Sequence, residues 1–536
     1  MSPQLVSLAA ALLALGGSLQ ARQSSGATPQ NLLVIVLDDV GTDMIGAYES
    51  YERSLGRPAG TPAATPAIDQ LLAAQGVSFA AAWATPKCSP TRAQLLTGLY
   101  GRRSGIGAIV KSEPFVGTRN PGLAHECSIL PQQLQSASTP YVSAAVGKWH
   151  LGDIEQLEAE PAHALGWPYG TWFDYYAGSR FNLESVFGPG SGNAYFSWRK
   201  TFASVLPQHA PCGPGAVSCE TPELAPPSVN YATVDTTEDA LAMMSSLPEP
   251  WLVYVSYNAI HSPYHVPPSG LPAAPCLPGG ALPHACELDL GADPIALARC
   301  MMTALDQQIG RLACAADPGD TTIVLIGDNG TPQAAVAPPF NPLHAKGTLY
   351  EGGVRVPLVI RSPLVPPARR GSFETRMVSS VDIHATLLDV AGAPPVANAD
   401  GRSLAGYLAS SSSPSVRTTN YTEAFFPNFK PQPSGGPPPN YVCNFHNQAL
   451  TDARFKLVRR TTRAHSNTSL LVVSEEFFDL GQGGPPDLSS GTPVPTPDWF
   501  EQNDLLAAGA PLQGAAREAY GRLSRLLDTR YPSLVR

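Results

Sequence analysis

Short apolar segments that end in polar residues constrain the fold of this chain more than any other feature. They are Asn31–Asp39, Tyr141–His150, Pro250–His261, Thr321–Gly330 and Val354–Pro363. Short continuous apolar runs are typical of strands buried on both faces of a parallel sheet. Helical patterns lie between them, at Thr65–Gly76, around Met301 and at Val381–Gly392. This alternation predicts an α/β fold, in which ligands bind beyond the carboxyl ends of the strands.

The composition is that of a globular protein with a substantial core. Hydrophobic residues make up 43% of the 536 residues and charged residues 14%. The net charge of −9 and the pI of about 5.7 argue against a nucleic-acid-binding protein, which is usually basic. After about residue 400 the pattern changes to loops, two strand-like runs (452–460 and 468–480) and a final amphipathic helix (514–531). We expect a main domain over residues 29–405 and a small antiparallel sheet with a packed helix over 406–536.

The first residues resemble an export signal. Residues 5–15 are apolar and too few to span a bilayer, and small residues follow as far as Ala21. We therefore expect a signal peptide over residues 1–21 and a periplasmic or secreted protein. No later run of 18 or more apolar residues was found, so no membrane span is expected. Asn420 and Asn467 lie in glycosylation sequons, which matter only in a eukaryotic secretory host.

The chain has nine cysteines, and in an exported protein an odd number leaves one over. With Cys88 set aside, the other eight allow up to four disulfides. The pairs Cys212–Cys219 and Cys276–Cys286 span short segments rich in proline and glycine, which suits local bridges. Cys300 and Cys314 are expected on one helix, about 21 Å apart, too far to bridge each other.

Cys88 stands at the expected start of a helix, in the segment KCSPTRAQLLTGLYGRRSG. Ser89 suits an N-cap, Pro90 the first helical position and Gly98 the helix end. The thiol would then lie just before a helix N-terminus, where the helix dipole favours negative charge, with Arg92 one turn further on. One interpretation is a structural cysteine, and another is a thiolate nucleophile. The Cys-x5-Arg spacing of the thiolate phosphatases is absent, because residue 94 is glutamine.

The same segment resembles the signature of the type I sulfatases, Cys-x-Pro-x-Arg followed by Leu-Thr-Gly. The stretch Tyr141–His150 resembles the second signature of that family, and Tyr350–Pro357 is typical of it. The resemblance covers most of residues 30–400. It implies an alkaline-phosphatase-like sandwich, with a large mixed and mostly parallel sheet flanked by helices. It also implies that a formylglycine-generating enzyme oxidises Cys88 to formylglycine (3-oxoalanine).

Two pairs of polar residues at strand ends indicate a metal site. Asp38 and Asp39 follow the first apolar run, and Asp328 and Asn329 follow the fourth. Each pair alone is more often a turn, but together at one sheet edge they form an oxygen site for a single hard cation. The resemblance assigns these four residues and the modified Cys88 to the metal, which is Ca²⁺ or, alternatively, Mg²⁺.

The resemblance also assigns the catalytic groups. It implies that Lys148 and Lys346 bind the sulfate, that His150 hydrogen-bonds the formylglycine and that Arg92 anchors it. His261 would face the sulfate and protonate the leaving group, a role that Lys346 could also take. The chain has Ile260 and His384 at positions where the family usually has proline.

The implied reaction is hydrolysis of an aryl or carbohydrate sulfate ester. A hydroxyl of the hydrated aldehyde attacks sulfur, and the aldehyde re-forms as inorganic sulfate leaves. The nearest alternative is a phosphonate monoester or phosphodiester hydrolase of the same superfamily. A two-zinc phosphatase would need more His and Asp ligands. From another class, the chain could be a catalytically silent cation-binding protein that kept the fold.

Overall fold

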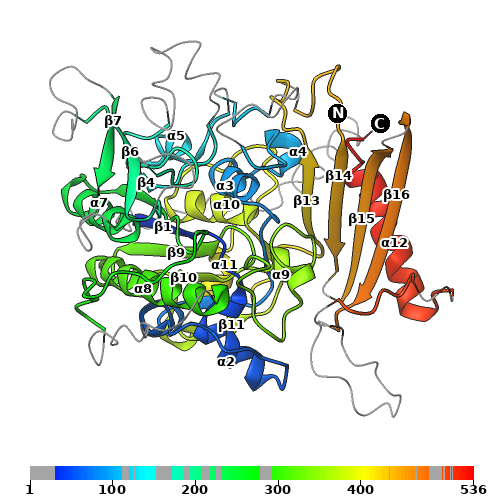
Figure 1. Ribbon diagram of the computed structural model, residues 1–536, viewed down its shortest axis with the longest axis horizontal. Coiled ribbons are helices and arrows are strands. Elements are labelled where there is room, and N and C mark those ends of the chain that lie inside the picture. Colours follow the sequence, from blue (N-terminus) through cyan, green and yellow to red (C-terminus); the bar gives the residue numbers. More distant parts are fainter. Residues whose placement is uncertain are drawn as a thin grey trace, which may run out of the picture.

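The computed structural model shows a large α/β part with a smaller sheet beside it at one end of the molecule (Figure 1). It describes residues 30–110, 120–124, 127–152, 172–185, 193–206, 231–277, 293–433, 435–452, 454–464, 470–481, 498, 501–507, 509 and 511–535, with the backbone alone for 218–224 and 467–469. The expected signal peptide over residues 1–21 lies outside these ranges. Among the described helices, none has the length and hydrophobicity needed to cross a bilayer.

A ten-stranded sheet in the order β11-β2-β10-β9-β1-β8-β4-β5-β6-β7 forms the centre of the large part. Its middle is parallel and consists of β9 (Thr321–Gly327), β1 (Asn31–Leu37), β8 (Trp251–Ser256), β4 (Val142–Gly147) and β5 (Tyr175–Gly178). Four of the five apolar runs form four of these strands, which confirms the predicted mixed, mostly parallel sheet. The fifth run forms β10 (Leu358–Arg361), which is antiparallel to β9, so the parallel expectation is wrong there.

The outer strands of this sheet are shorter or more polar. On one side lie β2 (Val77–Phe79) and β11 (Ser372–Glu374), and on the other lie β6 (Ser197–Ser204) and β7 (Ser218–Leu224). β6 runs antiparallel to both β5 and β7. The sequence analysis did not identify these four strands, because they lack a continuous apolar run.

Helices cover both faces of the sheet, and β1 shows why. Its residues are all buried and alternate between the faces: Leu32, Val34 and Val36 belong to one core, and Leu33, Ile35 and Leu37 to the other. The first core includes α3 (Cys88–Thr97), α5 (Leu130–Leu134), α10 (Val381–Val390) and α11 (Ala405–Ala409). The second includes α2 (Gly46–Ser54), the π-helix η2 (Ile68–Ala73), α7 (Ala232–Ser246) and α8 (Pro294–Ala315).

Several short elements complete the large part. A two-stranded sheet joins β3 (Ala82–Trp83) to β12 (Val378–Ser379). The short helices are η1 (Thr42–Met44), α4 (Gly101–Ser104), η5 (Pro342–His344), α9 (Glu351–Val354) and η6 (Pro367–Arg369).

The smaller sheet has four antiparallel strands in the order β13-β14-β15-β16, and α12 (Gly514–Arg530) packs against one face (Figure 1). The strands are β13 (Asn420–Phe426), β14 (Phe445–Thr451), β15 (Phe455–Ala464) and β16 (Asn467–Asp479). In β15, Leu457 packs with Leu523 of α12, whereas the neighbouring Val458 packs with Trp83 of the large part. The predicted C-terminal sheet and helix are confirmed, although β13 and β14 were not identified from the sequence. The boundary near residue 405 stays a prediction.

One expectation about the cysteines is wrong, and one of the two sequons is buried. Cys276 is bonded to Cys314 (S–S 2.02 Å) and not to Cys286, because small residues let the segment around Ala274 pack closely against Gly310 of α8. Cys300 and Cys314 do not pair with each other, as predicted. Asn420 is fully buried and donates to Val378 O at 2.7 Å, so it cannot carry a glycan in this fold. Cys212 and the side chain of Cys219 lie outside the described residues.

Candidate active site

The carboxyl ends of four parallel strands meet at one edge of the central sheet. In the strand register, Ser256 of β8 pairs with Val36 of β1 on one side and with Gly147 of β4 on the other. Leu37 of β1 pairs with Gly327 of β9. The residues that follow these strands therefore emerge side by side. They are Asp38 and Asp39 after β1, Lys148 and His150 after β4, His261 after β8, and Asp328 and Asn329 after β9.

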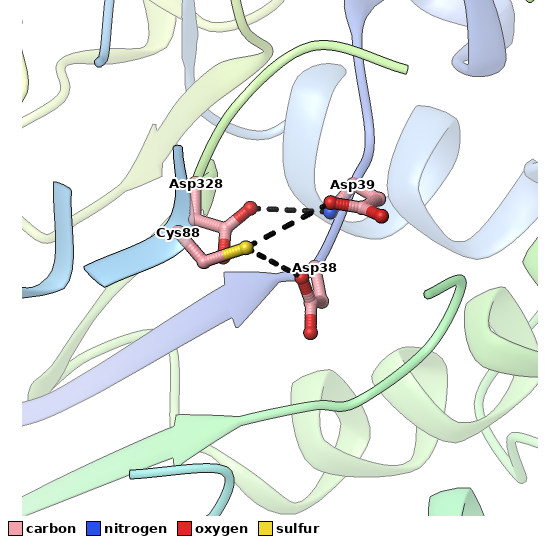
Figure 2. Close-up of side chains that lie close together, drawn as sticks. All are labelled: Asp38, Asp39, Cys88 and Asp328. Atoms are coloured by element: carbon pink, nitrogen blue, oxygen red, sulfur yellow. Dashed lines mark hydrogen bonds between the residues drawn. The ribbon is translucent and has the colours of Figure 1, made fainter. Parts of the chain in front are cut away.

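Three of the carboxylates converge on the thiol of Cys88 (Figure 2). One ligand atom from each of Asp38, Asp39, Cys88 and Asp328 lies within 4.8 Å of the others, and all four residues are buried. Cys88 Sγ is 3.5 Å from Asp38 Oδ1 and 4.0 Å from Asp39 Oδ1. The backbone N of Asp39 donates to Asp328 Oδ1 at 3.1 Å. The structure thus joins Asp39 and Asp328, which are 289 positions apart in the sequence, with Cys88, which lies between them in the chain.

 The cluster forms only when the chain folds, because Asp38 and Asp328 lie far apart in the sequence.

Cys88 reaches the cluster from the first residue of α3. The helix begins at Cys88, after Lys87 in extended backbone (φ −140°, ψ 153°), and ends at Gly98, whose φ of 68° favours glycine, as predicted. The expected N-cap role of Ser89 is wrong, because Ser89 lies inside the helix. Its hydroxyl donates to His150 O (2.8 Å) and accepts from Val110 N (3.0 Å). Ser89 therefore ties the start of α3 to the turn after β4.

Arg92 lies fully buried behind the carboxylates. Its Nη2 and Nε donate to Asp328 Oδ2 at 2.7 Å and 3.1 Å, and Nη2 is 3.7 Å from Asp38 Oδ2. Its Nη1 donates to Lys148 O at 3.2 Å and to Ser256 Oγ. A guanidinium with this many fixed partners is suited to orienting the carboxylates and the two strand ends around them.

Two lysines neutralise the remaining carboxylates. Lys148 Nζ is 2.5 Å from Asp38 Oδ2, and both side chains are fully buried. Lys346 Nζ pairs with Asp39 Oδ1, and 13% of the Lys346 side chain is exposed. With Arg92, the three cationic side chains match the three carboxylates in charge. The partial exposure of Lys346 indicates that it lies toward the open side of the cluster.

The buried charges shift the pKa values of the cluster in opposite directions. Burial alone would raise the pKa of Asp38, but Lys148, His261 and Arg92 outweigh it and hold this pKa well below its ordinary range. Burial and the neighbouring Asp38 raise the pKa of Asp328. Burial, with a contribution from Asp328, raises the pKa of Cys88 far above that of a free thiol.

The two predicted catalytic histidines differ in their surroundings. His150 is buried in left-handed backbone (φ 61°), and its Nδ1 has no hydrogen-bond partner among the described residues. Burial and Lys148 lower its pKa well below 6.5. His261 is half-buried, and its Nδ1 lies 2.8 Å from Ser262 O. Burial lowers the pKa of His261 as well, although Asp39 opposes the shift. Both rings are therefore neutral at pH 7.

Asn329 provides an observation that favours a cation in the cluster. Its Nδ2 donates to Asp39 Oδ1 and to Gly330 O, both at 2.9 Å, which fixes the amide beside the carboxylates. Its Oδ1 is buried and has no hydrogen-bond partner within the described part of the chain. An unpartnered buried acceptor costs about 1–3 kcal/mol, so such atoms are rare. A hard divalent cation would satisfy this oxygen together with Asp38, Asp39 and Asp328, and the donor set fits Ca²⁺ or Mg²⁺.

The sequence analysis missed two residues that support the site. Ser256 accepts a hydrogen bond from Arg92, and its place at the end of a buried run could have indicated it. The hydroxyl of Tyr195 lies 2.6 Å from Asn258 O and 2.8 Å from His261 O and donates to this pair. Tyr195 thereby fixes the loop that carries His261, and no local pattern around it indicates that role.

Comparisons with known proteins agree with this fold and site. A family model described as Sulfatase matches residues 30–393. A sulfatase from Formosa agariphila is 28% identical over 440 residues, covering 73% of this chain and 74% of that protein. The N-acetylgalactosamine-6-sulfatase of Sus scrofa is 26% identical over 394 residues, covering 68% of this chain and 63% of that protein.

Solved structures share the fold over nearly the whole chain. A Bacteroides thetaiotaomicron sulfatase connected with glycosaminoglycan metabolism has a TM-score of 0.63 at 16% identity, covering 94% of this chain and 98% of that one. A protein in complex with its substrate, D-glucosamine-2-N,6-O-disulfate, has a TM-score of 0.56 at 18% identity, covering 94% and 97%. The phosphonate monoester hydrolase of Agrobacterium radiobacter has a TM-score of 0.59 at 20% identity, covering 94% and 96%. At these identities the likeness establishes the fold alone.

The fold is that of the alkaline-phosphatase-like class that the sequence motifs suggested. Within that class the chain belongs to the sulfatase family and is an enzyme. The resemblance stated from the motifs is confirmed.

Proposed function

We propose that the chain hydrolyses sulfate esters at the cluster of Asp38, Asp39, Cys88 and Asp328, with Cys88 converted to formylglycine and one Ca²⁺ bound. Mg²⁺ is the alternative cation. The observation that carries the proposal is the convergence of three carboxylates on the buried Cys88. When formed, the hydrated aldehyde would supply the nucleophile, and the cation would supply positive charge beside it. The unpartnered Oδ1 of Asn329 supports the cation.

The lysines and histidines of the cluster have positions that suit the remaining work. Lys148 and Lys346 carry the positive charge that would balance the sulfate group, and Lys346 lies on the open side. His261 is neutral and half-buried, so it can exchange a proton with the leaving group or with water. His150 is neutral and buried, and its Nδ1 is available to hold a proton near the modified Cys88. Arg92 would keep Asp328 in place.

The substrate class follows from the relatives by analogy. N-acetylgalactosamine-6-sulfatase and the neighbour bound to a disulfated glucosamine both act on sulfated sugars, which favours a carbohydrate sulfate over a simple aryl sulfate. The phosphonate monoester hydrolase keeps the alternative open, since its fold is equally similar. A panel containing 4-nitrophenyl sulfate, sulfated monosaccharides and a phenylphosphonate monoester separates these activities by kcat/KM.

Export is part of the proposal and has independent support. The disulfide Cys276–Cys314 is of the kind that persists in oxidising compartments outside the cytosol. With the signal peptide expected over residues 1–21, it favours a periplasmic or secreted enzyme. A formylglycine-generating enzyme would then be the partner required during maturation.

The first test is the mass of the tryptic peptide that starts at Cys88 and ends at Arg92, from protein made in its native host. We expect sulfur to be replaced by oxygen with the loss of two hydrogens. Cys443, a second buried cysteine outside any disulfide, should remain a thiol and serves as the internal control. The Cys88→Ala variant should fold and lose turnover, whereas Cys443→Ala should keep it. An unmodified thiol in active enzyme would refute the mechanism, and in inactive protein it would favour the silent cation-binding alternative.

A further inference from the structure

Strand β16 carries a run of apolar side chains that the fold leaves open to solvent. Among the described residues, nine large apolar side chains are exposed, and four of them are consecutive in β16. These are residues 470–473, with exposed fractions from 37% to 57%. Exposed apolar residues are ordinary when they are scattered singly, whereas a contiguous group of them marks an interaction surface. We call residues 470–473 of β16 the open edge.

The open edge is exposed on both faces of the small sheet. Successive side chains of a strand point to opposite faces, and further along β16 Phe477 is buried in the core with α12 while Phe478 is buried against the large part. Neither core extends to the open edge. The neighbouring strand β15 offers no apolar cover, because the residues opposite Val473, Val472 and Leu471 are Thr461, Thr462 and Arg463.

The backbone of the open edge also has polar groups that point away from the sheet. β16 is the last strand of the small sheet and lies at the side of it away from the large part (Figure 1). Phe477 O accepts from Leu505 N at 2.8 Å, and Phe477 N donates to Asp504 Oδ1 at 2.9 Å. Phe477 therefore turns its N–H and C=O away from β15.

The same direction holds for alternate residues along β16. Leu471 and Val473 lie an even number of residues from Phe477, so their N–H and C=O groups also point away from β15. Within the described part of the chain, no segment bonds to these groups. The edge of β16 is thus covered around Phe477 and open at residues 470–473. An edge with outward backbone groups and apolar side chains is suited to pairing with another extended strand.

A second copy of the open edge has the pattern that this pairing needs. In an antiparallel arrangement with a two-fold axis at Val472, Leu471 of one copy lies opposite Val473 of the other. Both residues turn their N–H and C=O outward, so these groups pair across the axis. The two copies of Val472 face each other, and apolar side chains therefore meet apolar side chains on both faces. A two-fold interface of this kind closes on itself.

The charges beside the open edge allow two copies to approach. The chain has a net charge of −9, so two copies repel each other overall. The first charged residues after the open edge are Glu475 and Glu476, and each is paired across the sheet. Arg459 Nε lies 2.6 Å from Glu475 Oε1, and Arg460 Nη1 lies 2.9 Å from Glu476 Oε1. The carboxylates nearest to the open edge are therefore neutralised within their own copy.

We propose that two copies of the chain form a dimer through residues 470–473 of β16, in antiparallel register about a two-fold axis at Val472. The dimer joins the two small sheets into one continuous sheet. The inference does not rest on the proposed function, since no residue of the catalytic cluster belongs to β16. The apolar contact is small, so we expect a dissociation constant of about 10 µM, at the weak end of specific interfaces.

Sedimentation velocity of the full chain, from about 1 to about 200 µM, tests the proposal. The Val472→Lys variant places like charges opposite each other at the axis and should raise the dissociation constant at least about tenfold. Val442→Lys is the matched control, because Val442 is 56% exposed and lies outside β16. The control makes the same change in net charge and should shift the dissociation constant less than about twofold. Urea unfolding checks that both variants fold.

Two further variants test the register. Val472→Glu alone should weaken the dimer as Val472→Lys does, whereas an equal mixture of the two variants should dimerise, since opposite charges then meet at the axis. Val473→Pro removes an N–H that points out of the sheet and that the fold does not use. Proline is tolerated at such an edge position, so this variant should keep its unfolding midpoint and weaken the dimer about tenfold.

The remaining outcomes overturn the proposal. A wild type that stays monomeric over the whole concentration range would show that the open edge does not pair with a second copy. Equal weakening by Val472→Lys and Val442→Lys would mean a general effect of charge. A mixture of V472K and V472E that stays monomeric would exclude the axis at Val472. Assemblies that grow beyond two copies would mean open stacking of strands and not a closed pair.

Discussion

His384 of α10 gives the chain a specific sensitivity to acid. The residue is fully buried, and neither ring nitrogen has a hydrogen-bond partner among the described residues. Its ring packs on Gly98 at the end of α3, where an added Cβ would lie 2.6 Å from Nδ1. Burial lowers the pKa of His384 from 6.5 to about 4.

The lowered pKa sets the size and the sign of the effect. Below pH 6.5 the unfolded chain takes up a proton on this histidine, whereas the folded chain does so only near pH 4. Keeping His384 neutral therefore costs the folded state nothing above pH 6.5. As the pH falls toward 4, the free energy of unfolding decreases because the unfolded chain binds this proton and the folded chain does not. Between pH 7.5 and pH 4.5 the loss in the free energy of unfolding is about 2.5 kcal/mol.

Urea unfolding of the wild type, His384→Leu and His384→Gln at both pH values measures this contribution. Other groups titrate in the same range, so the quantity compared is the difference between variant and wild type. Neither variant titrates at position 384. The free energy of unfolding of each variant, relative to that of the wild type, should therefore rise by about 2.5 kcal/mol when the pH falls from 7.5 to 4.5. Leu and Gln should differ from each other by an amount that does not depend on pH. A gain below about 0.5 kcal/mol in both variants would refute the reasoning.

Three further predictions concern the buried ion pairs, the cation and the loop of His261. Lys456 is fully buried between Glu351 (3.0 Å) and Glu501 (2.8 Å), so Lys456→Met should cost about 3–5 kcal/mol in urea unfolding. Adding Glu501→Gln should recover part of that cost, and no loss in the single variant would mean that the carboxylates are not both charged. Exhaustive chelation should abolish sulfatase activity, and added Ca²⁺ should restore it. The Asn329→Ala variant should need about tenfold more Ca²⁺ for its half-maximal rate. Activity that survives chelation would contradict the cation site. Tyr195→Phe removes one hydrogen bond worth about 1 kcal/mol, so it should lower kcat/KM about fivefold while the unfolding midpoint stays nearly unchanged. An unchanged kcat/KM would show that the loop of His261 holds its position without Tyr195.

The central sheet could be predicted because its signals are local. A continuous apolar run such as Leu32–Leu37 indicates a strand buried on both faces by its own composition. The polar residue that ends the run marks the sheet edge, so Asp38 and Asp328 could be expected to lie together once the strands were taken as parallel. The exact register of β1 and β9 brings these carboxylates together, and the sequence motifs do not give that register.

Other features depend on partners that are distant in the sequence. β13 buries polar residues, and its Thr422 donates to Ala84 O while Glu423 accepts from Arg102 N, so the strand shows no apolar pattern. Cys276 pairs with Cys314 because small residues let two segments approach, which spacing along the chain does not reveal. The N-cap preference of Ser89 yields to a tertiary contact, since its hydroxyl is used by His150 O and Val110 N.

The burial of Cys88 also orders events during protein synthesis. Its exposed fraction in the folded chain is 1%, so an enzyme that modifies the thiol has no access once the fold is complete. Asp328, which closes the cluster, leaves the ribosome about 240 residues after Cys88. At about 5–20 residues per second, that delay is about 12–50 s. The thiol is therefore open to the proposed modification for an interval that translation speed sets. If Cys88 is modified as proposed, faster translation of the same sequence should yield a larger fraction of unmodified enzyme.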